Sequence, residues 1–303
     1  MAKFLVKGSA KLAGKINVAG NKNSVLPIMA AALLAKDPST LENVPQISDV
    51  QTMAELLTLC GVELKFHSPN RLTINPAKIN KVEFPTHLTE KLRASVTLLG
   101  PMVARIGYIK MGYPGGDVIG RRPLDTHFQV LEALGAKVKK ENNYFEVTSS
   151  GLKGAEIFLQ EASVTATENA IVAAAAAEGT TVIKRAASEP HVVDLCEFLI
   201  KLGAQIEGVG SNILKIKGKQ KFYGATHSIR PDHIEVGTFA ILAAVTKSRV
   251  SISPAIKSDL DMTLLTLKKF GVNFELAGNV LKVSPSKLNA VEKVVTDVWP
   301  CLL

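Results

Sequence analysis

The sequence predicts an α/β protein that is built from four near-copies of one βαβαββ unit. In each copy an amphipathic helix ends at a glycine, which can adopt the left-handed conformation of a helix C-cap, and an alternating strand follows. These glycines lie 74, 68 and 68 residues apart, at Gly61, Gly135, Gly203 and Gly271. A period of roughly 70 residues is longer than a solenoid repeat and approaches a small subdomain. An ordinary doubly wound sheet, the alternative on pattern alone, would not show this repetition.

The elements of each copy follow in the same order along the chain. A strand at 15–19 opens the first copy. The first helices are rich in Ala and Leu and span 26–35, 94–106, 167–177 and 234–244. The second helices and the strands after them occupy 56–66, 130–140, 198–208 and 266–276. Closing strand pairs are clearest at 62–66 with 71–74 and at 204–206 with 213–216.

Composition limits the class of protein. With 303 residues, 47% of them apolar, the chain is long enough for two domains. Three cysteines without CxxC spacing indicate a reducing compartment, and six histidines without HxH or HExxH spacing predict no metal site. The N-terminus has no apolar run of signal-peptide length, and the most apolar stretch, 171–177, is far shorter than the ~20 residues of a membrane span. We therefore expect a cytoplasmic protein without a membrane partner.

The charge balance points to anionic ligands. A net charge of +9 and a pI of about 9.4 favour a nucleotide, a phosphate metabolite or a nucleic acid. A nucleic-acid binder is the weakest of these, because aromatic residues make up only 5% and do not interleave with the basic ones. We expect small-molecule ligands and no nucleic acid.

The first candidate anion site is the turn at 20–23, with the sequence GNKN. It places Lys22 and Asn23 at the start of a helix, where N–H groups and the helix dipole favour an anion and the Lys22 ammonium suits a phosphate. A capped surface turn is the alternative.

The second candidate is the loop at 114–127, with the sequence PGGDVIGRRPLDTH. Paired glycines let backbone approach a ligand closely, and Arg121 and Arg122 offer bidentate contacts to phosphate or carboxylate. Asp117 or Asp125 could move a proton, and Arg93 is a third possible anion contact. The alternative is a solvated loop with incidental ion pairs.

Six stretches, spread in order over nearly the whole chain, carry a resemblance. They read GNKNSVLPIMAAALLA, LRASVTLLGPMVARIG, PGGDVIGRRPLD, EASVTATENAIVAAAAAEGTT, SEPHVVDL and RPDHIEVGTF. Together they resemble the UDP-N-acetylglucosamine 1-carboxyvinyltransferase family of enolpyruvyl transferases. The 3-phosphoshikimate enolpyruvyl transferases share the fold, but the PGGDVIGRRP and SEPHVVDL stretches resemble the UDP-sugar branch.

The resemblance implies a fold and a domain division. Its fold is an inside-out α/β barrel of six such units in two domains, of which this chain contains four. Residues 22–229 would form a complete three-unit domain that bears the catalytic loop, and 1–21 with 230–303 an incomplete second domain. We expect a truncated gene product or a fragment of a longer sequence.

The resemblance also implies an activity. It is transfer of the enolpyruvyl group of phosphoenolpyruvate to the 3-hydroxyl of UDP-N-acetylglucosamine, with release of phosphate and no cofactor. This is the first committed step of peptidoglycan precursor synthesis, and so belongs to cell-wall biogenesis, cell shape and cell division. The alternative is a truncated, inactive fragment that still binds the UDP-sugar. The oligomeric state stays open.

Site residues carry over position by position. Lys22 and Asn23 match the pair that meets both substrates, and Arg93 and Arg122 match arginines that hold anionic groups. The remaining matches are to UDP-binding positions, namely Pro123, Leu124, Asp125, Thr126, Ser163 and Val164. Asn21 and Thr165 depart from the family pattern, which more often has a small residue and Gly there, and could alter affinity.

Asp117 occupies the position of a loop cysteine that protonates the methylene carbon of phosphoenolpyruvate. A free Asp, with a pKa of about 3.9, is rarely protonated at neutral pH, whereas a thiol near 8.5 mostly is, a deficit of ~4 kcal/mol. Asp117 therefore needs a raised pKa to act as the acid. We expect desolvation and the negative charge of both substrates to provide it, against the opposing effect of Arg121 and Arg122.

Overall fold

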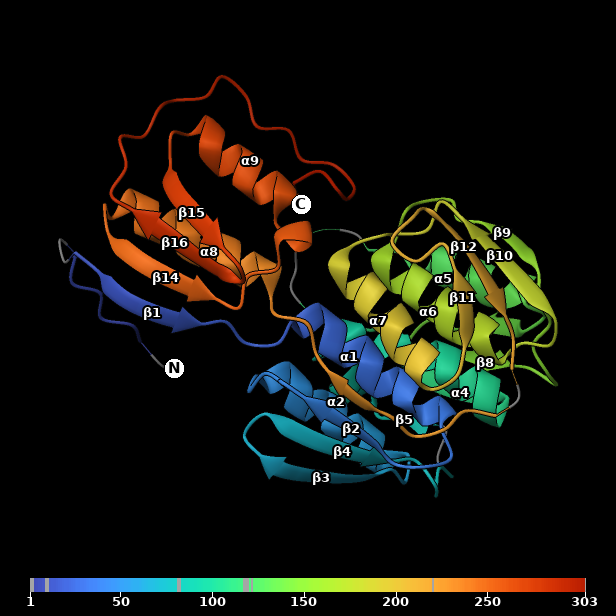
Figure 1. The fold of residues 1–303 in the computed structure, drawn as a ribbon. Coiled ribbons are helices and arrows are strands. Elements are labelled where there is room, and N and C mark those ends of the chain that lie inside the picture. The colour runs from blue at the N-terminus through green and yellow to red at the C-terminus, as the bar shows by residue number, and fades with distance from the viewer. Residues whose placement is uncertain are drawn as a thin grey trace. The chain divides into compact units, whose positions relative to one another are not determined.

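The computed structural model describes residues 3–8, 11–80, 83–116, 120, 122–219 and 221–302. The chain divides into two compact units. One is Gly20–Arg230, and the other joins the residues up to Ala19 with those from Pro231 onward. The domain implied by the resemblance was 22–229, with crossings near Gly20–Asn23 and Arg230–Pro231. Figure 1 shows the helices and strands of each unit.

The unit Gly20–Arg230 contains three four-stranded sheets with one topology. In each sheet two neighbouring strands pair in parallel. The next two strands along the chain form an antiparallel hairpin beside them, with the later strand of the hairpin on the inside and the earlier one at the edge of the sheet. The first sheet consists of β13 (Thr226–Ser228), β2 (Ser39–Glu42), β4 (Arg71–Asn75) and β3 (Glu63–Ser68). The second consists of β5 (Glu83–Phe84), β6 (Tyr108–Gly112), β8 (Tyr144–Thr148) and β7 (Lys137–Lys140). The third consists of β9 (Glu156–Phe158), β10 (Thr180–Lys184), β12 (Ile213–Lys217) and β11 (Gln205–Glu207).

The other unit contains a fourth sheet of the same topology. Its strands are β1 (Ala13–Asn17), β14 (Arg249–Ser253), β16 (Val280–Ser284) and β15 (Asn273–Ala277). Residues far apart in sequence supply the first strand of two sheets, because β1 pairs with β14 and β13 pairs with β2. The α/β fold class and its repeated sheet are therefore confirmed.

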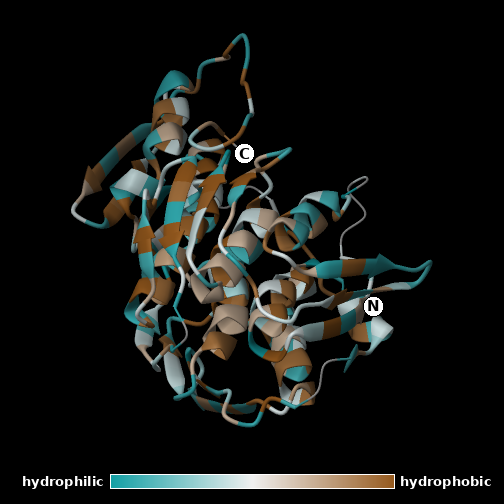
Figure 2. Ribbon diagram, turned by 90° about the vertical axis from the view of Figure 1, so that its right-hand side faces the viewer, coloured by the Kyte–Doolittle hydropathy of each residue, from teal (hydrophilic) through white to brown (hydrophobic). Residues whose placement is uncertain are grey.

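Alternating burial explains why these segments form strands. Along β10 and β12 every second side chain is buried, as expected for a sheet with one covered face. Figure 2 shows the same alternation as bands of brown and teal along strands.

Four helices end in the predicted way. They are α2 (Ser48–Leu59), α5 (Asp125–Ala133), α7 (Pro190–Lys201) and α9 (Asp261–Lys269). Each is followed two residues later by its glycine, and all four glycines have φ between +74° and +100°. In α2 the Gly61 amide bonds to the Thr58 carbonyl and the Val62 amide to the Leu57 carbonyl, which is a Schellman motif that the other three helices repeat.

The first helices of the copies differ from the prediction at their ends. Helix α1 (Lys22–Ala31) begins four residues earlier than expected and continues as a 3₁₀ turn, Ala32–Leu34. The predicted helix at 94–106 is a 3₁₀ segment, η2 (Arg93–Leu98), followed by α4 (Leu99–Ile106). Pro101 provides the reason, since a proline lacks the N–H of a regular helix and is tolerated in a first turn. The remaining elements are α3 (Thr86–Thr89), α6 (Val164–Ala176), α8 (His233–Val245) and a 3₁₀ turn η3 (Lys257–Asp259).

Helices α1 and α6 form the core of the unit Gly20–Arg230. Every residue from Ser24 to Ala31 and from Ala166 to Ala175 is buried. Helix α1 packs against α2, α7 and η2, and α6 packs against α4, α5, α7 and η2. The small Ala and Leu side chains of the sequence thus allow helices to be covered on all sides.

Candidate functional site

The start of α1 holds the first two predicted ligand contacts. Lys22 is the first residue of the helix and Asn23 the second, and both are exposed. Asn21 is the N-cap, and its Oδ1 accepts hydrogen bonds from the amides of Asn23 (2.7 Å) and Ser24 (3.1 Å). The expectation that these amides are free for an anion is therefore wrong, because the side chain of Asn21 already occupies them.

Lys22 also has an internal partner. Its ammonium forms an ion pair with the carboxylate of Asp49, in the first turn of α2. The Lys22 side chain is half exposed, so this pair is weak and the ammonium can exchange its partner for a phosphate. Gly20 fixes the turn before the helix, since a Cβ there would collide with the backbone oxygen of Asn43.

Arg93 and Arg122 form the centre of a second group. Arg93 is half-buried at the start of η2, and its Nη2 donates to the Arg122 carbonyl (2.9 Å). Its Nη1 donates to the Pro114 carbonyl at 3.5 Å. Burial, and then the positive charge of Arg122, lower the pKa of the Arg93 guanidinium. Two cations held this close favour an anionic ligand between them.

The two carbonyls that Arg93 contacts flank the predicted catalytic loop. Asp117 and Arg121 themselves lie outside the described residues. The role of Asp117 stays a prediction from the sequence.

The residues after Arg122 lead into α5. Pro123 is exposed and Leu124 is buried. Asp125 opens the helix and pairs with Lys140 at 3.3 Å, so its carboxylate is engaged at the surface. The buried Thr126 lies with its hydroxyl 3.4 Å from a carboxylate oxygen of Glu161, which brings α5 to the segment before α6.

Ser163 and Val164 form the start of α6. Ser163 is the N-cap, and its hydroxyl accepts from the Ala166 amide at 3.4 Å. Val164 is the first helical residue and is half-buried. Arg93, the run 122–126 and the pair 163–164 therefore form one group, where η2, α5 and α6 begin.

Sequence reasoning missed a buried polar network beside this group. His127 is 1% exposed, and its Nε2 lies 3.2 Å from Thr165 Oγ1 while its Nδ1 lies 2.9 Å from Asn169 Nδ2. Burial and the nearby Arg93 lower the pKa of His127 to about 3, so the imidazole is neutral. His127 is the last residue of the PGGDVIGRRPLDTH stretch, but nothing in the neighbouring sequence predicts that its side chain is buried.

Two buried acids were also missed. Glu168 on α6 is fully buried, and burial followed by the charge of Glu189 raises its pKa well above the ordinary value. Burial raises the pKa of Glu189, which precedes α7, as well. The SEPHVVDL stretch contains Glu189, but only the fold brings it near Glu168.

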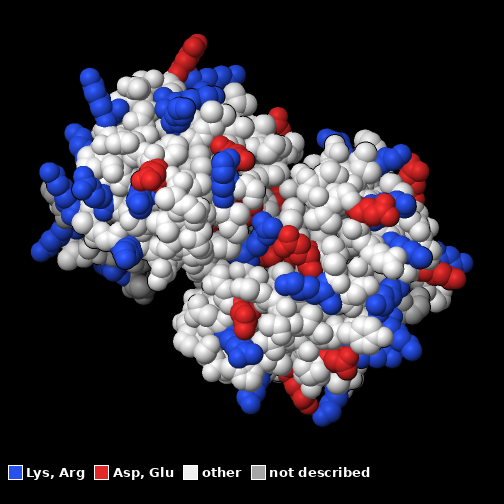
Figure 3. Space-filling model, in the orientation of Figure 1, with Lys and Arg blue, Asp and Glu red and all other residues white. Residues whose placement is uncertain are grey.

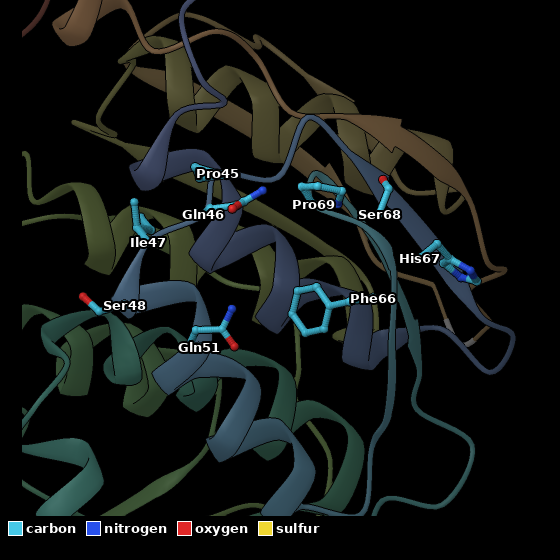
Figure 4. A pocket seen from close by; sticks show the side chains of 9 residues that line it. All are labelled: Pro45, Gln46, Ile47, Ser48, Gln51, Phe66, His67, Ser68 and Pro69. Carbon is cyan, nitrogen blue, oxygen red and sulfur yellow. The ribbon is translucent and has the colours of Figure 1, made fainter.

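A separate open cavity lies where α2 begins and β3 ends (Figure 4). Its volume is about 640 Å³, and it is lined by Pro45, Gln46, Ile47, Ser48, Gln51, Phe66, His67, Ser68 and Pro69. These side chains include no Lys or Arg, so the cavity lacks the chemistry of the predicted phosphate contacts.

Charge on the visible face is mixed. Figure 3 shows Lys and Arg interspersed with Asp and Glu over the unit Gly20–Arg230, and mainly Lys and Arg over the other unit. In the part of the chain that the structure describes, no group of three or more His, Cys, Asp or Glu side chains is arranged to hold a metal ion. None of the described helices is long and apolar enough to cross a membrane.

With this geometry in place, comparison with known proteins identifies the family. The profile of EPSP synthase (3-phosphoshikimate 1-carboxyvinyltransferase) matches residues 6–299, and the chain belongs to this family. A solved structure, the enolpyruvyl transferase NikO from Streptomyces tendae, has the same fold with a TM-score of 0.87. It is 22% identical and is matched over 98% of this chain and 71% of its own.

Within the family, the chain is similar to UDP-N-acetylglucosamine 1-carboxyvinyltransferases, which confirms the resemblance found from the motifs. The protein of that name from Bradyrhizobium diazoefficiens is 44% identical over 98% of this chain and 70% of its own length. The one from Treponema denticola is 44% identical over 93% of this chain and 66% of its own length. The chain thus spans about two thirds of these relatives.

Proposed function

We propose that the protein acts in transfer of the enolpyruvyl group from phosphoenolpyruvate to the 3-hydroxyl of UDP-N-acetylglucosamine, with release of phosphate. In the reaction the sugar 3-hydroxyl loses its proton as its oxygen bonds to C2 of phosphoenolpyruvate, and the methylene carbon gains a proton to become a methyl group. The tetrahedral ketal then loses phosphate together with one proton of that methyl group, which restores the carbon–carbon double bond. It is the first committed step of peptidoglycan precursor synthesis, in the cytoplasm, and serves cell shape and division.

One observation carries this proposal. The cations and hydroxyls expected to hold the UDP portion come from three separate elements and lie in one group, around the Arg93 contact to the Arg122 carbonyl. An incidental charged loop would not be linked to the start of α6. The names of the relatives at 44% identity support the same substrates.

The residues have distinct proposed roles. Arg93 and Arg122 hold anionic oxygens, since a guanidinium has five donors and Arg93 spends two on the carbonyls described above. Lys22, once it leaves Asp49, provides a compact charge for the phosphate of phosphoenolpyruvate, and Asn23 lies beside it. Asp117 is the proposed proton donor to the methylene carbon.

The test measures phosphate release from phosphoenolpyruvate with and without UDP-N-acetylglucosamine. Release that depends on the sugar nucleotide is expected. Calorimetric titration of the sugar nucleotide runs in parallel, because binding without phosphate release would leave a binding protein and contradict the transferase proposal. Asp117→Asn is expected to abolish release while sugar-nucleotide affinity is kept.

The assignment of the acid has its own measurement. The pH dependence of turnover is compared between the wild type and Asp117→Cys, since a thiol and a carboxyl have different pKa values. Identical profiles would show that residue 117 is not the donor.

A further inference from the structure

The polar network of His127, Thr165 and Asn169 has no part in the roles above, yet it lies between α5 and α6 at the proposed UDP site. Asn169 is fully buried, and the side chain of Thr165 is half-buried beside Ser163 and Val164. Each hydrogen bond of the network has a defined donor and acceptor. These assignments follow from the backbone groups that Asn169 contacts.

The first step is the orientation of the Asn169 amide. The Gly100 amide donates to Asn169 Oδ1 at 2.7 Å, and Asn169 Nδ2 donates to the Val96 carbonyl at 2.9 Å. A backbone N–H can only donate and a carbonyl can only accept, so the opposite orientation of the Asn169 amide would break both bonds. It is therefore the NH₂ group, a donor, that faces His127 Nδ1 at 2.9 Å.

The second step is the tautomer of His127. A nitrogen that faces an NH₂ donor must accept, so Nδ1 carries no proton. The imidazole is neutral, because its pKa is about 3, and its single proton is then on Nε2. Nε2–H donates to Thr165 Oγ1 at 3.2 Å.

The third step is the hydroxyl of Thr165. Because Oγ1 accepts from His127, its own proton must point away from the imidazole. Thr165 is the second residue of α6, where the helix dipole favours negative charge. Arg93 influences His127 electrostatically, so a cation lies near the same network.

We propose that Thr165 donates a hydrogen bond from Oγ1 to an oxygen of the diphosphate of the bound UDP group, and that His127 and Asn169 are positioning residues for this donor. The inference rests on the proposed function for the ligand. It gives Thr165 a ligand contact, whereas from the sequence this residue was only a departure from the family pattern. A diphosphate is the expected acceptor because hydrogen bonds to ionised oxygens are the stronger ones.

The experiment measures UDP affinity by calorimetry on the full chain, for the wild type, Thr165→Val and Thr165→Ser. Valine keeps the shape of threonine and lacks the donor, so UDP should bind about tenfold more weakly, as loss of one hydrogen bond to a charged group predicts. Serine keeps the hydroxyl and should stay within about twofold of the wild type. Equal UDP affinity in Thr165→Val and the wild type would overturn this inference alone. Absence of UDP binding to the wild type would overturn the proposed function and this inference with it.

A second readout is the protonation state of His127 in the wild type. Nitrogen-15 NMR of the wild-type imidazoles distinguishes a proton on Nε2 from one on Nδ1, and His127→Gln assigns the signal. A neutral Nε2–H form of His127 is expected at neutral pH. A proton on Nδ1 would overturn the direction of the network and the role of Thr165.

Discussion

The same structural repeat appears in two different settings in this chain. In the unit Gly20–Arg230, the helices α1 and α6 are buried on all sides, because other helices of that unit cover them. In the other unit, α8 packs on β14 and β16 of its own sheet, and apolar side chains such as Ile241 and Val245 are 54% and 60% exposed. The comparison teaches that an Ala- and Leu-rich helix is stabilised by its neighbours more than by its own sequence.

The largest expected effect is on stability, from matched isoleucine truncations in the two settings. Ile171→Ala on α6 removes a fully buried side chain and should lower the free energy of unfolding by about 2 to 5 kcal/mol. Ile241→Ala on α8 should change it by less than about 0.5 kcal/mol. Urea denaturation of both variants measures this, and similar losses would break the comparison.

The next effect is the dependence of stability on pH. The pKa of His127 falls from 6.5 to about 3 in the folded protein, so below pH 6.5 the unfolded chain takes up a proton that the folded chain refuses. Stability should therefore fall as the pH drops, by about 2 kcal/mol from this residue at pH 5.

Unfolding free energies of the wild type and His127→Gln at pH 7.5 and pH 5 test this. The variant should lose about 2 kcal/mol less between the two values. His233, in the other unit, also has a pKa lowered by burial, so His233→Gln should change the slope in the same direction. If His127→Gln keeps the full slope of the wild type, His127 is not the group that titrates.

The smallest effect concerns the exposed ion pairs. Asp49→Asn removes the partner of Lys22, whose side chain is half exposed, and should cost less than about 1 kcal/mol of stability. Asp261→Asn removes the partner of Lys257 in the other unit, where both side chains are more exposed, and should cost no more. Thermal unfolding measures both. A loss above about 2 kcal/mol for Asp49→Asn would mean that the ion pair with Asp49 is too stable for Lys22 to leave it readily for a phosphate.

The sequence predicted the fold better than it predicted the polar interior. Glycine after an amphipathic helix is a local signal, and Gly61 has the left-handed conformation that the pattern requires. The start of α1 was placed too late, because the cap by Asn21 was not recognised. The proposed binding group at Arg93 and Arg122 was predicted from motifs. His127 and Glu168 were missed as buried polar groups, since their burial depends on contacts between helices that are far apart in sequence.

The proposed binding group at Arg93 and Arg122 belongs to the unit Gly20–Arg230 and not to the repeat in the other unit. Calorimetric titration of UDP-N-acetylglucosamine into Arg122→Gln and Arg249→Gln compares an arginine of that group with an exposed arginine on β14. We predict that Arg122→Gln weakens binding about tenfold or more and that Arg249→Gln leaves it within about twofold of the wild type. Equal affinities of the two variants would contradict the account.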